Sequence, residues 1–149
     1  MKNIKPKLIE LLKTGYCTPQ IARLAKKLNE PSTTIHYNIK SLEKDDAIKG
    51  YKAVFQHKKI DEGLCVYVLV NLRSTQYGNP ETIAEELVKH KEVEGIDVIA
   101  GNWELIIKVR TKNQEEYFNF LKNVISRKEI EKSISLISMK QFKTDFIVL

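Results

Sequence analysis

The chain has few cysteines, and their positions exclude two common kinds of small stabilised domain. It contains only two, Cys17 and Cys65, which lie far apart in the sequence. No CxxC pair and no Cys/His cluster occurs at the spacing of metal ligands, so neither a disulfide framework nor a zinc site is expected. We therefore expect a fold that depends on its hydrophobic core and that carries no metal and no cofactor.

Long hydrophobic runs are also absent. The longest strictly apolar run, Cys65 to Val70, has six residues, whereas a membrane helix needs about 20. The N-terminus lacks the basic-then-apolar layout of a signal peptide, and 6 glycines and 4 prolines give no compositional sign of disorder. We expect a cytoplasmic protein that is folded throughout.

Positive charge is concentrated in the first third of the chain. The formal net charge is +6, and residues 1–50 hold ten Lys or Arg against five Asp or Glu. The remaining residues hold fifteen against fourteen. A basic segment on a nearly neutral body favours binding to a polyanion such as DNA through counterion release. A solvated basic surface without a partner is the alternative.

Three short amphipathic helices are predicted within residues 1–50. Gly15 ends the first, and Thr18 followed by Pro19 is expected to cap and open the second. Residues 29–31 then break the pattern before the third. The apolar faces of the three helices contain, in order, Ile4, Leu8, Leu11 and Leu12; Ile21, Leu24, Ala25 and Leu28; and Ile35, Ile39 and Leu42.

The rest of the chain follows an extended, polar segment at residues 51–63, which we interpret as a linker strand or hinge. The elements expected after it are a strand at 64–73, a helix opened by Asn79 and Pro80, strands at 93–100 and 104–110, a helix capped by Asn113 with Glu116, a strand at 133–142 and an apolar tail at 146–149.

This βαββαβ order predicts a ferredoxin-like domain, in which both helices cover one side of a four-stranded antiparallel sheet. The expected fold class is therefore α+β. A three-helix, winged-helix-like helix-turn-helix domain at residues 1–50 is joined through residues 51–63 to a ferredoxin-like ligand-binding and oligomerisation domain at residues 64–149.

Both faces of the predicted sheet are apolar. In the first strand Val66 and Val68 alternate with Cys65, Tyr67 and Leu69, so hydrophobic side chains point to both sides. A soluble monomer does not leave a large apolar sheet face in water. We expect a homodimer through that face, with a larger oligomer of dimers as an extension. The alternative is that the N-terminal helices of the same chain cover it.

The second and third helices have the spacing of a helix-turn-helix, whose second helix enters the major groove of duplex DNA. The side of the third helix opposite its apolar stripe carries hydrogen-bonding and cationic side chains, which suit base edges and phosphates. A plain three-helix bundle is the alternative. The candidate DNA-binding residues are Thr33, Thr34, His36, Tyr37, Asn38, Lys40 and Lys44.

Residues 35–51, "IHYNIKSLEKDDAIKGY", resemble the recognition helix and following turn of the Lrp/AsnC (leucine-responsive regulatory) family. "GNWEL" at residues 101–105 resembles the family's second signature, a "G.YDL"-like turn between the middle strands. The resemblance covers nearly the whole chain. It implies a sequence-specific transcription regulator whose C-terminal domain binds an amino acid or related metabolite near that turn, at contacts between dimers. The chain has Asn38, Asp46 and Glu104 where the family usually has Arg, Gly and Asp.

The chemistry of residues 101–104 also suits a small zwitterion. Gly101 permits close backbone approach, Asn102 and Glu104 offer acceptors, and Trp103 offers a large, partly apolar wall. These four residues are the candidate effector site. The other interpretation is a hairpin turn with a tryptophan at an interface.

No catalytic constellation is apparent. The three histidines, His36, His57 and His90, have no nucleophile or carboxylate at a recognisable spacing, and no phosphate-binding loop occurs. We therefore expect that the protein is not an enzyme. Two alternatives to a regulator are a nucleoid-architectural protein with little sequence preference and a tetrapyrrole decarboxylase-like enzyme on the same architecture. The basic excess in the N-terminal helices argues against the second, which needs basic groups around a cavity in the C-terminal domain.

Overall fold

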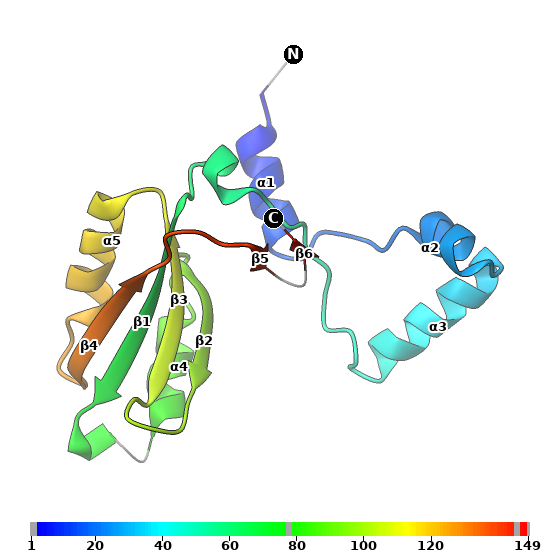
Figure 1. Cartoon of the computed structure of the whole chain (residues 1–149). Coiled ribbons are helices and arrows are strands. Elements are labelled where there is room, and N and C mark those ends of the chain that lie inside the picture. The colour runs from blue at the N-terminus through cyan, green and yellow to red at the C-terminus, as the bar shows by residue number, and fades with distance from the viewer. Residues whose placement is uncertain (1–2, 77–78, 145–146, 149) are drawn as a thin grey trace. The chain divides into compact units, whose positions relative to one another are not determined.

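The computed structural model describes residues 3–76, 79–144 and 147–148. The chain divides into two compact units, Met1–Val54 and Phe55–Leu149, and the segment expected as a linker contributes to both. No helix in the described part of the chain combines the length and apolar composition needed to cross a membrane. The N-terminal unit contains α1 (Lys5–Lys13), α2 (Ile21–Leu28) and α3 (Ser32–Lys44) (Figure 1).

The beginning of α2 differs from the prediction. Gln20, not Thr18, occupies the N-cap position, and no side chain caps the helix. The reason is a tight turn at Pro19, whose carbonyl accepts a hydrogen bond from the N–H of Ile21 at 3.1 Å and delays the helix. The end of α2 lies at Asn29, which adopts the left-handed conformation (φ 56°) that reverses the chain towards α3.

The C-terminal unit contains one four-stranded antiparallel sheet in the order β2-β3-β1-β4. This order, with β1 and β3 in the centre, confirms the predicted ferredoxin-like fold (Figure 1). Its elements are the 3-10 helix His57–Ile60, β1 (Leu64–Leu72), the 3-10 turn Ser74–Gln76, α4 (Pro80–Leu87), β2 (Val93–Val98), β3 (Leu105–Thr111), α5 (Gln114–Phe120) with a π-helical turn Leu121–Ile125, β4 (Ile130–Ile137) and the short pair β5 (Lys143–Thr144) and β6 (Ile147–Val148).

Two details of this unit depart from the expected elements. β4 begins earlier than residue 133, because Ile130 and Lys132 pair with the end of β1, and it ends earlier than residue 142, because the chain leaves the sheet after Ser138, whose N–H donates to the carbonyl of Cys65 at 2.9 Å. The Asn113 cap of α5 is confirmed, with its side chain accepting from the N–H of Glu116 at 3.0 Å, but the Glu116 carboxylate reaches the N–H of Lys112. Of the expected tail, Phe146 and Leu149 lie outside the described residues.

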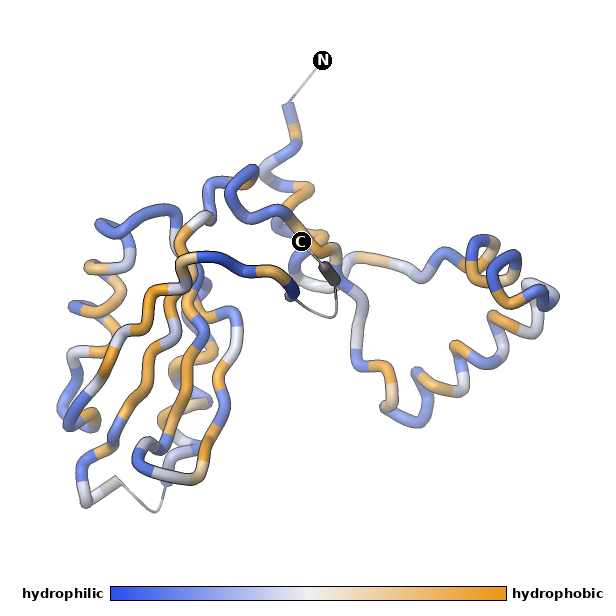
Figure 2. The backbone as a smooth tube through the Cα atoms, in the orientation of Figure 1, coloured by the Kyte–Doolittle hydropathy of each residue, from blue (hydrophilic) through white to orange (hydrophobic). Residues whose placement is uncertain are grey.

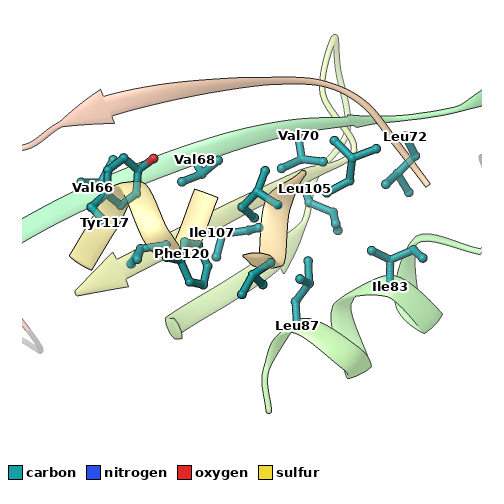
Figure 3. Close-up of a cluster of buried hydrophobic side chains, with 14 residues drawn as sticks. Val66, Val68, Val70, Leu72, Ile83, Leu87, Leu105, Ile107, Tyr117 and Phe120 are labelled. Carbon is teal, nitrogen blue, oxygen red and sulfur yellow. The ribbon is translucent and has the colours of Figure 1, made fainter. Parts of the chain in front are cut away.

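The hydrophobic core lies between the sheet and the helices α4 and α5 (Figure 3). Alternate residues of β1 and β3 point into it with no exposed surface, and Leu87 and Phe120 fill it from the helices. Burying each such side chain stabilises the fold by about 1.5–3 kcal/mol. The fully buried strand residues are Val66, Val68, Val70, Leu72, Leu105, Ile107 and Val109.

The opposite face of the sheet, which we call the open face, has no helix of the C-terminal unit on it. It carries Tyr67 and Leu69 from β1, both half-buried, and Ile134 and Leu136 from β4, which are 37% and 50% exposed. Figure 2 shows that the strands are hydrophobic along most of their length. The second apolar face expected from the alternation is thus the one that α4 and α5 leave uncovered.

Candidate DNA-binding surface and effector turn

The helix α3 presents its polar side to solvent. Ile35 anchors the helix on its buried side, and Ile39 is half-buried one turn later. All seven predicted DNA-binding residues are exposed, and Tyr37 has 76% of its surface in solvent. The surface therefore offers threonine and tyrosine hydroxyls, an imidazole and two ammonium groups without a protein element of this unit packed over them.

One predicted cation on this surface is already paired. The Lys40 ammonium donates to the Glu43 carboxylate at 2.7 Å, and the Tyr51 hydroxyl donates to the other carboxylate oxygen at 3.0 Å. The hydrogen bond from Lys40 lowers the pKa of Glu43, and the same bond raises the pKa of Lys40. Glu43 therefore joins α3 to the segment that follows it, and both Glu43 and Tyr51 belong to the family-like motif.

Asn38, which stands where the family usually has arginine, is partly engaged with its own helix. Its side-chain amide donates to the carbonyl of Thr34 at 2.8 Å. One amide hydrogen and the side-chain oxygen remain to contact a base edge. The contact holds the side chain along the helix surface, so its reach towards DNA is shorter than that of an arginine.

Three cations on α2 form a further basic surface of this unit and were left out of the predicted site. Arg23, Lys26 and Lys27 are all exposed and line a shallow groove with Pro19 and Gln20. In a helix-turn-helix the first helix of the pair crosses the DNA backbone, where cations neutralise phosphates. The signal was available in the sequence as the polar side of the second helix.

The candidate effector turn connects β2 to β3. Gly101 has φ 137°, a conformation that L side chains rarely adopt, and the space where a Cβ would lie is open. In the described part of the chain, no carbonyl or side chain accepts from the N–H groups of Gly101, Asn102 or Trp103. Consecutive unpaired N–H groups at a turn can bind a carboxylate.

The Glu104 carboxylate is already hydrogen-bonded within the fold through one of its two oxygens. One of its oxygens accepts from the N–H of Leu72 at 2.8 Å and from the Asn71 side chain at 3.2 Å. Asn71 also donates to the carbonyl of Asn102 at 2.6 Å. These bonds tie the turn to the end of β1, and they leave the second carboxylate oxygen to accept from an ammonium group.

Trp103 lies beside a cation, Lys132, whose contact with it was not predicted from the sequence. The Lys132 ammonium, on β4, is 5.7 Å from the centre of the indole ring. Asn71 and Lys132 are paired across β1 and β4, so both reach the same end of the open face as the turn. Neither residue was predicted, because only the pairing of strands distant in sequence brings them to residues 101–104.

The two surfaces supply binding groups, and their described residues form no cluster of metal-ligating side chains. The described residues contain no group of three or more His, Cys, Asp or Glu side chains that could hold a metal ion. The α3 surface combines cations with hydrogen-bonding groups, which suits duplex DNA. The turn combines free N–H groups, a carboxylate and an aromatic wall, which suits a small zwitterion.

Comparison with known protein families places these two surfaces in a recognised context. A family model described as the Lrp/AsnC ligand binding domain matches residues 65–148. The HTH-type transcriptional regulator FL11 of Pyrococcus furiosus is 29% identical over 143 residues, which cover 96% of this chain and 92% of that protein.

Solved structures of similar fold extend over both units. AsnC of Escherichia coli superposes with a TM-score of 0.73 at 21% identity, covering 99% of this chain and 97% of AsnC. A transcriptional regulator of Neisseria meningitidis, solved as a complex with L-Met, superposes with a TM-score of 0.73 at 18% identity, covering 97% of this chain and 93% of that one. At these identities the likeness concerns the fold.

Proposed function

The chain belongs to the Lrp/AsnC family of transcriptional regulators, and from that premise we propose that it binds operator DNA through α3 as a dimer, under the control of an amino acid bound at residues 101–104. The observation that carries this proposal is that the same chain contains an exposed, cationic α3 and a turn whose backbone N–H groups have no hydrogen-bond acceptor. The regulator needs no chemistry on its ligand, because binding energy alone can shift its DNA affinity.

The DNA contact depends on cations from both helices of the helix-turn-helix. Lys40 and Lys44 on α3, with Arg23 and Lys26 on α2, suit phosphates, while Thr33 and Asn38 suit base edges. If a dimer neutralises about 6–10 phosphates, its affinity falls by roughly 10³–10⁵ between about 50 and 200 mM salt.

The pair formed by Lys40 and Glu43 provides a sharp test of this contact. Lys40→Ala should weaken binding to all sequences alike and reduce the salt slope by about 1 per contact. Glu43→Gln should strengthen binding, because it leaves the Lys40 charge without its carboxylate partner. Fluorescence anisotropy with promoter and random duplexes measures both effects. Tyr51→Phe is the control, since it removes a hydrogen bond to Glu43 without changing charge. Salt-insensitive binding would contradict the proposal.

The open face of the sheet provides the dimer interface. Leu69, Ile106, Ile134 and Leu136 lie on it, and an apolar surface of this kind is stabilised by packing against a second copy. A two-fold axis would place two α3 helices on half-sites about 10 bp, or a multiple of it, apart.

Sedimentation of two matched variants tests that interface. Leu136→Glu should shift the protein to the 17.2 kDa monomer. Phe118→Glu is the control, because Phe118 is similarly exposed, at 63% against 50%, but lies on α5 outside the open face. A wild-type monomer at micromolar concentration would refute the dimer.

An amino acid fits the turn at both of its charged ends. Its carboxylate can accept from the N–H groups of residues 101–103 with Lys132 nearby, and its ammonium can donate to the free oxygen of Glu104. Its side chain would then lie against Trp103 and set selectivity. The L-Met complex of the Neisseria regulator makes methionine the first compound to test.

A thermal-shift screen of the twenty amino acids, followed by DNA titrations with each hit, tests the effector site. The expected coupling is about 1–3 kcal/mol, or 5- to 150-fold in DNA affinity, and it must be reciprocal. Gly101→Val should abolish the response through its φ of 137°, and leave effector-free DNA binding intact. Glu104→Gln should weaken the effector while keeping an acceptor for Leu72. If no amino acid shifts the melting temperature, the turn is structural.

A further inference from the structure

A cavity of about 330 Å³ lies at the opposite end of β1 and β3 from the effector turn. Cys65 pairs with Arg110 at this end, whereas Val70 pairs with Leu105 next to the turn, so the sites are about 17 Å apart along β1. The volume is within the range of small-molecule sites. Its lining consists of Phe55, Gln56, His57, Lys58, Gly63, Cys65, Arg110, Ser138, Met139, Lys140 and Gln141.

The floor of the cavity is a buried guanidinium. Arg110 is only 8% exposed, donates through Nε to Glu94 at 2.8 Å, and donates through both terminal nitrogens to the Gln141 side chain at 3.1 Å. Each terminal nitrogen of an arginine carries two hydrogens, so one hydrogen on each remains for another acceptor. The guanidinium is thus held on two sides, and its two remaining hydrogens point away from each other, so each can serve a separate acceptor.

Positive charge around this floor exceeds negative charge. Lys108 and Arg110 share a single carboxylate, that of Glu94, at 2.8 Å each. The lining itself adds Lys58 and Lys140, and none of the eleven described lining residues is Asp or Glu. Burial and the nearby charge of Arg110 lower the pKa of His57 in the cavity wall, against the raising effect of its hydrogen bond to Glu62.

The remaining walls are apolar or neutral. Phe55 provides hydrophobic surface, Met139 lies at the mouth with 91% of its surface exposed, the Cys65 thiol is buried beside the Gln141 amide at 3.6 Å, and Ser138 supplies a hydroxyl. A ligand that fills this space therefore needs an anionic head for Arg110 and an apolar body. An ammonium group would meet cations and no carboxylate in the lining, which disfavours amino acids.

We propose that this cavity is a second ligand site, which takes a small monocarboxylate with an apolar body and no ammonium group. The carboxylate accepts from one of the two outward hydrogens of Arg110, with Lys140 at the rim, and the apolar body lies against Phe55 and towards Met139. Because Phe55 and His57 belong to the segment that enters the C-terminal unit, such a ligand orders that segment against β1 and β3. The site lies at the other end of the open face from the effector turn, since Cys65 and Arg110 point to the same side of the sheet as Leu69, and its ligand differs from an amino acid in charge.

Methionine-methyl NMR of the full chain tests this site directly. The chain has two methionines, Met1 and Met139, so a ¹³C-methyl label gives one reporter in the cavity and one other signal. Titration with 4-methylpentanoate should move the Met139 signal saturably at concentrations up to about 10 mM. The neutral amide of the same acid, and leucine, should leave that signal unmoved.

Two isosteric variants separate charge from shape. Gln141→Glu adds a carboxylate that pairs with Arg110, so the variant keeps the fold while its affinity for 4-methylpentanoate falls by at least about tenfold. Gln114→Glu, at an exposed position of α5, makes the same change in net charge and should bind as the wild type does. No saturable shift of Met139, equal binding of the amide, or unchanged affinity of Gln141→Glu would each overturn the proposal.

Discussion

The two units of the chain bury their hydrophobic residues to very different extents. In the C-terminal unit, eight large side chains, including Leu72, Leu87 and Ile107, have less than 2% of their surface exposed. In the N-terminal unit only Ala25 and Ile35 are buried among the described residues. Exposed hydrophobic side chains of the N-terminal unit include Ile4, Leu8, Leu11, Leu24, Leu28 and Leu42, whose exposure ranges from 37% to 62%. In Figure 2 the helices of this unit alternate between hydrophobic and hydrophilic stretches.

This difference in burial indicates how each unit keeps its candidate binding residues in position. The ferredoxin-like unit has a closed core on one face of its sheet and can hold the effector turn and the cavity rigidly. The helical unit depends more on local devices, such as the left-handed Asn29, the bond between Tyr51 and Glu43, and the hydrogen bond from the N–H of Ala53 to the carbonyl of Leu12 at 3.1 Å. Its stability therefore rests on contacts outside its own small core.

The largest expected difference in stability comes from truncating one leucine to alanine in each unit. Leu87→Ala should lower the free energy of unfolding of the C-terminal unit by about 3 kcal/mol, because it opens a cavity in a fully buried site. Leu28→Ala should cost less than about 0.5 kcal/mol, since Leu28 is 62% exposed.

Urea unfolding measures this contrast at a fixed protein concentration. Trp103 is the single tryptophan and reports on the C-terminal unit, while far-ultraviolet circular dichroism reports on both. A large, concentration-dependent loss in Leu28→Ala would show instead that a second copy covers that side chain.

An intermediate effect is expected at the buried charge cluster. Hydrogen bonds from Arg110 and Lys108 lower the pKa of Glu94 against the raising effect of burial. Its ionised form therefore stabilises the folded chain at neutral pH, and that stability is lost as pH falls below the ordinary value of 4.5 and through the lowered pKa. Glu94→Gln should cost about 2 kcal/mol at neutral pH.

The cost should shrink as acid protonates the wild-type carboxylate. Unfolding followed by Trp103 fluorescence from neutral pH to below the pKa of Glu94 tests the sign. Glu43→Gln is the counterpart in the N-terminal unit and should cost less stability, because the Lys40 partner is 62% exposed. Equal costs in the two units would contradict the contrast in burial.

The smallest expected effect is a gain at the turn after α3. Asp46 has φ 55°, a left-handed conformation, and it stands at a position where the family usually has glycine. Asp46→Gly should relieve about 1 kcal/mol of backbone strain in the folded chain. The greater entropy of the unfolded chain with glycine offsets part of this, so the free energy of unfolding should rise by about 0.5 kcal/mol. Asp45→Gly is the control, since Asp45 has φ −85° and should only be destabilised. Hydrogen exchange of the α3 amides measures both changes.

Much of the fold was accessible from local patterns. The three N-terminal helices, the βαββαβ order and the Asn113 cap follow from apolar spacing and turn residues, which depend on neighbours within a few positions. The start of α2 was predicted wrongly, because a cap at Thr18 and a turn at Pro19 have similar sequence signals. The alternation in β1 predicted two apolar faces, but it carried no information about which of them the helices would cover.

The sequence by itself determined which segments are helices and strands, where positive charge gathers and which family-like motifs are present, because these properties are local. Only the tertiary structure decided that Lys132 and Asn71 lie beside Trp103 and Glu104, and that Arg110, Gln141 and His57 line one cavity. The physical reason is that strand order and register bring together residues that lie far apart in the sequence. A one-residue shift of β4 against β1 would turn Lys132 to the other face of the sheet and separate it from the turn.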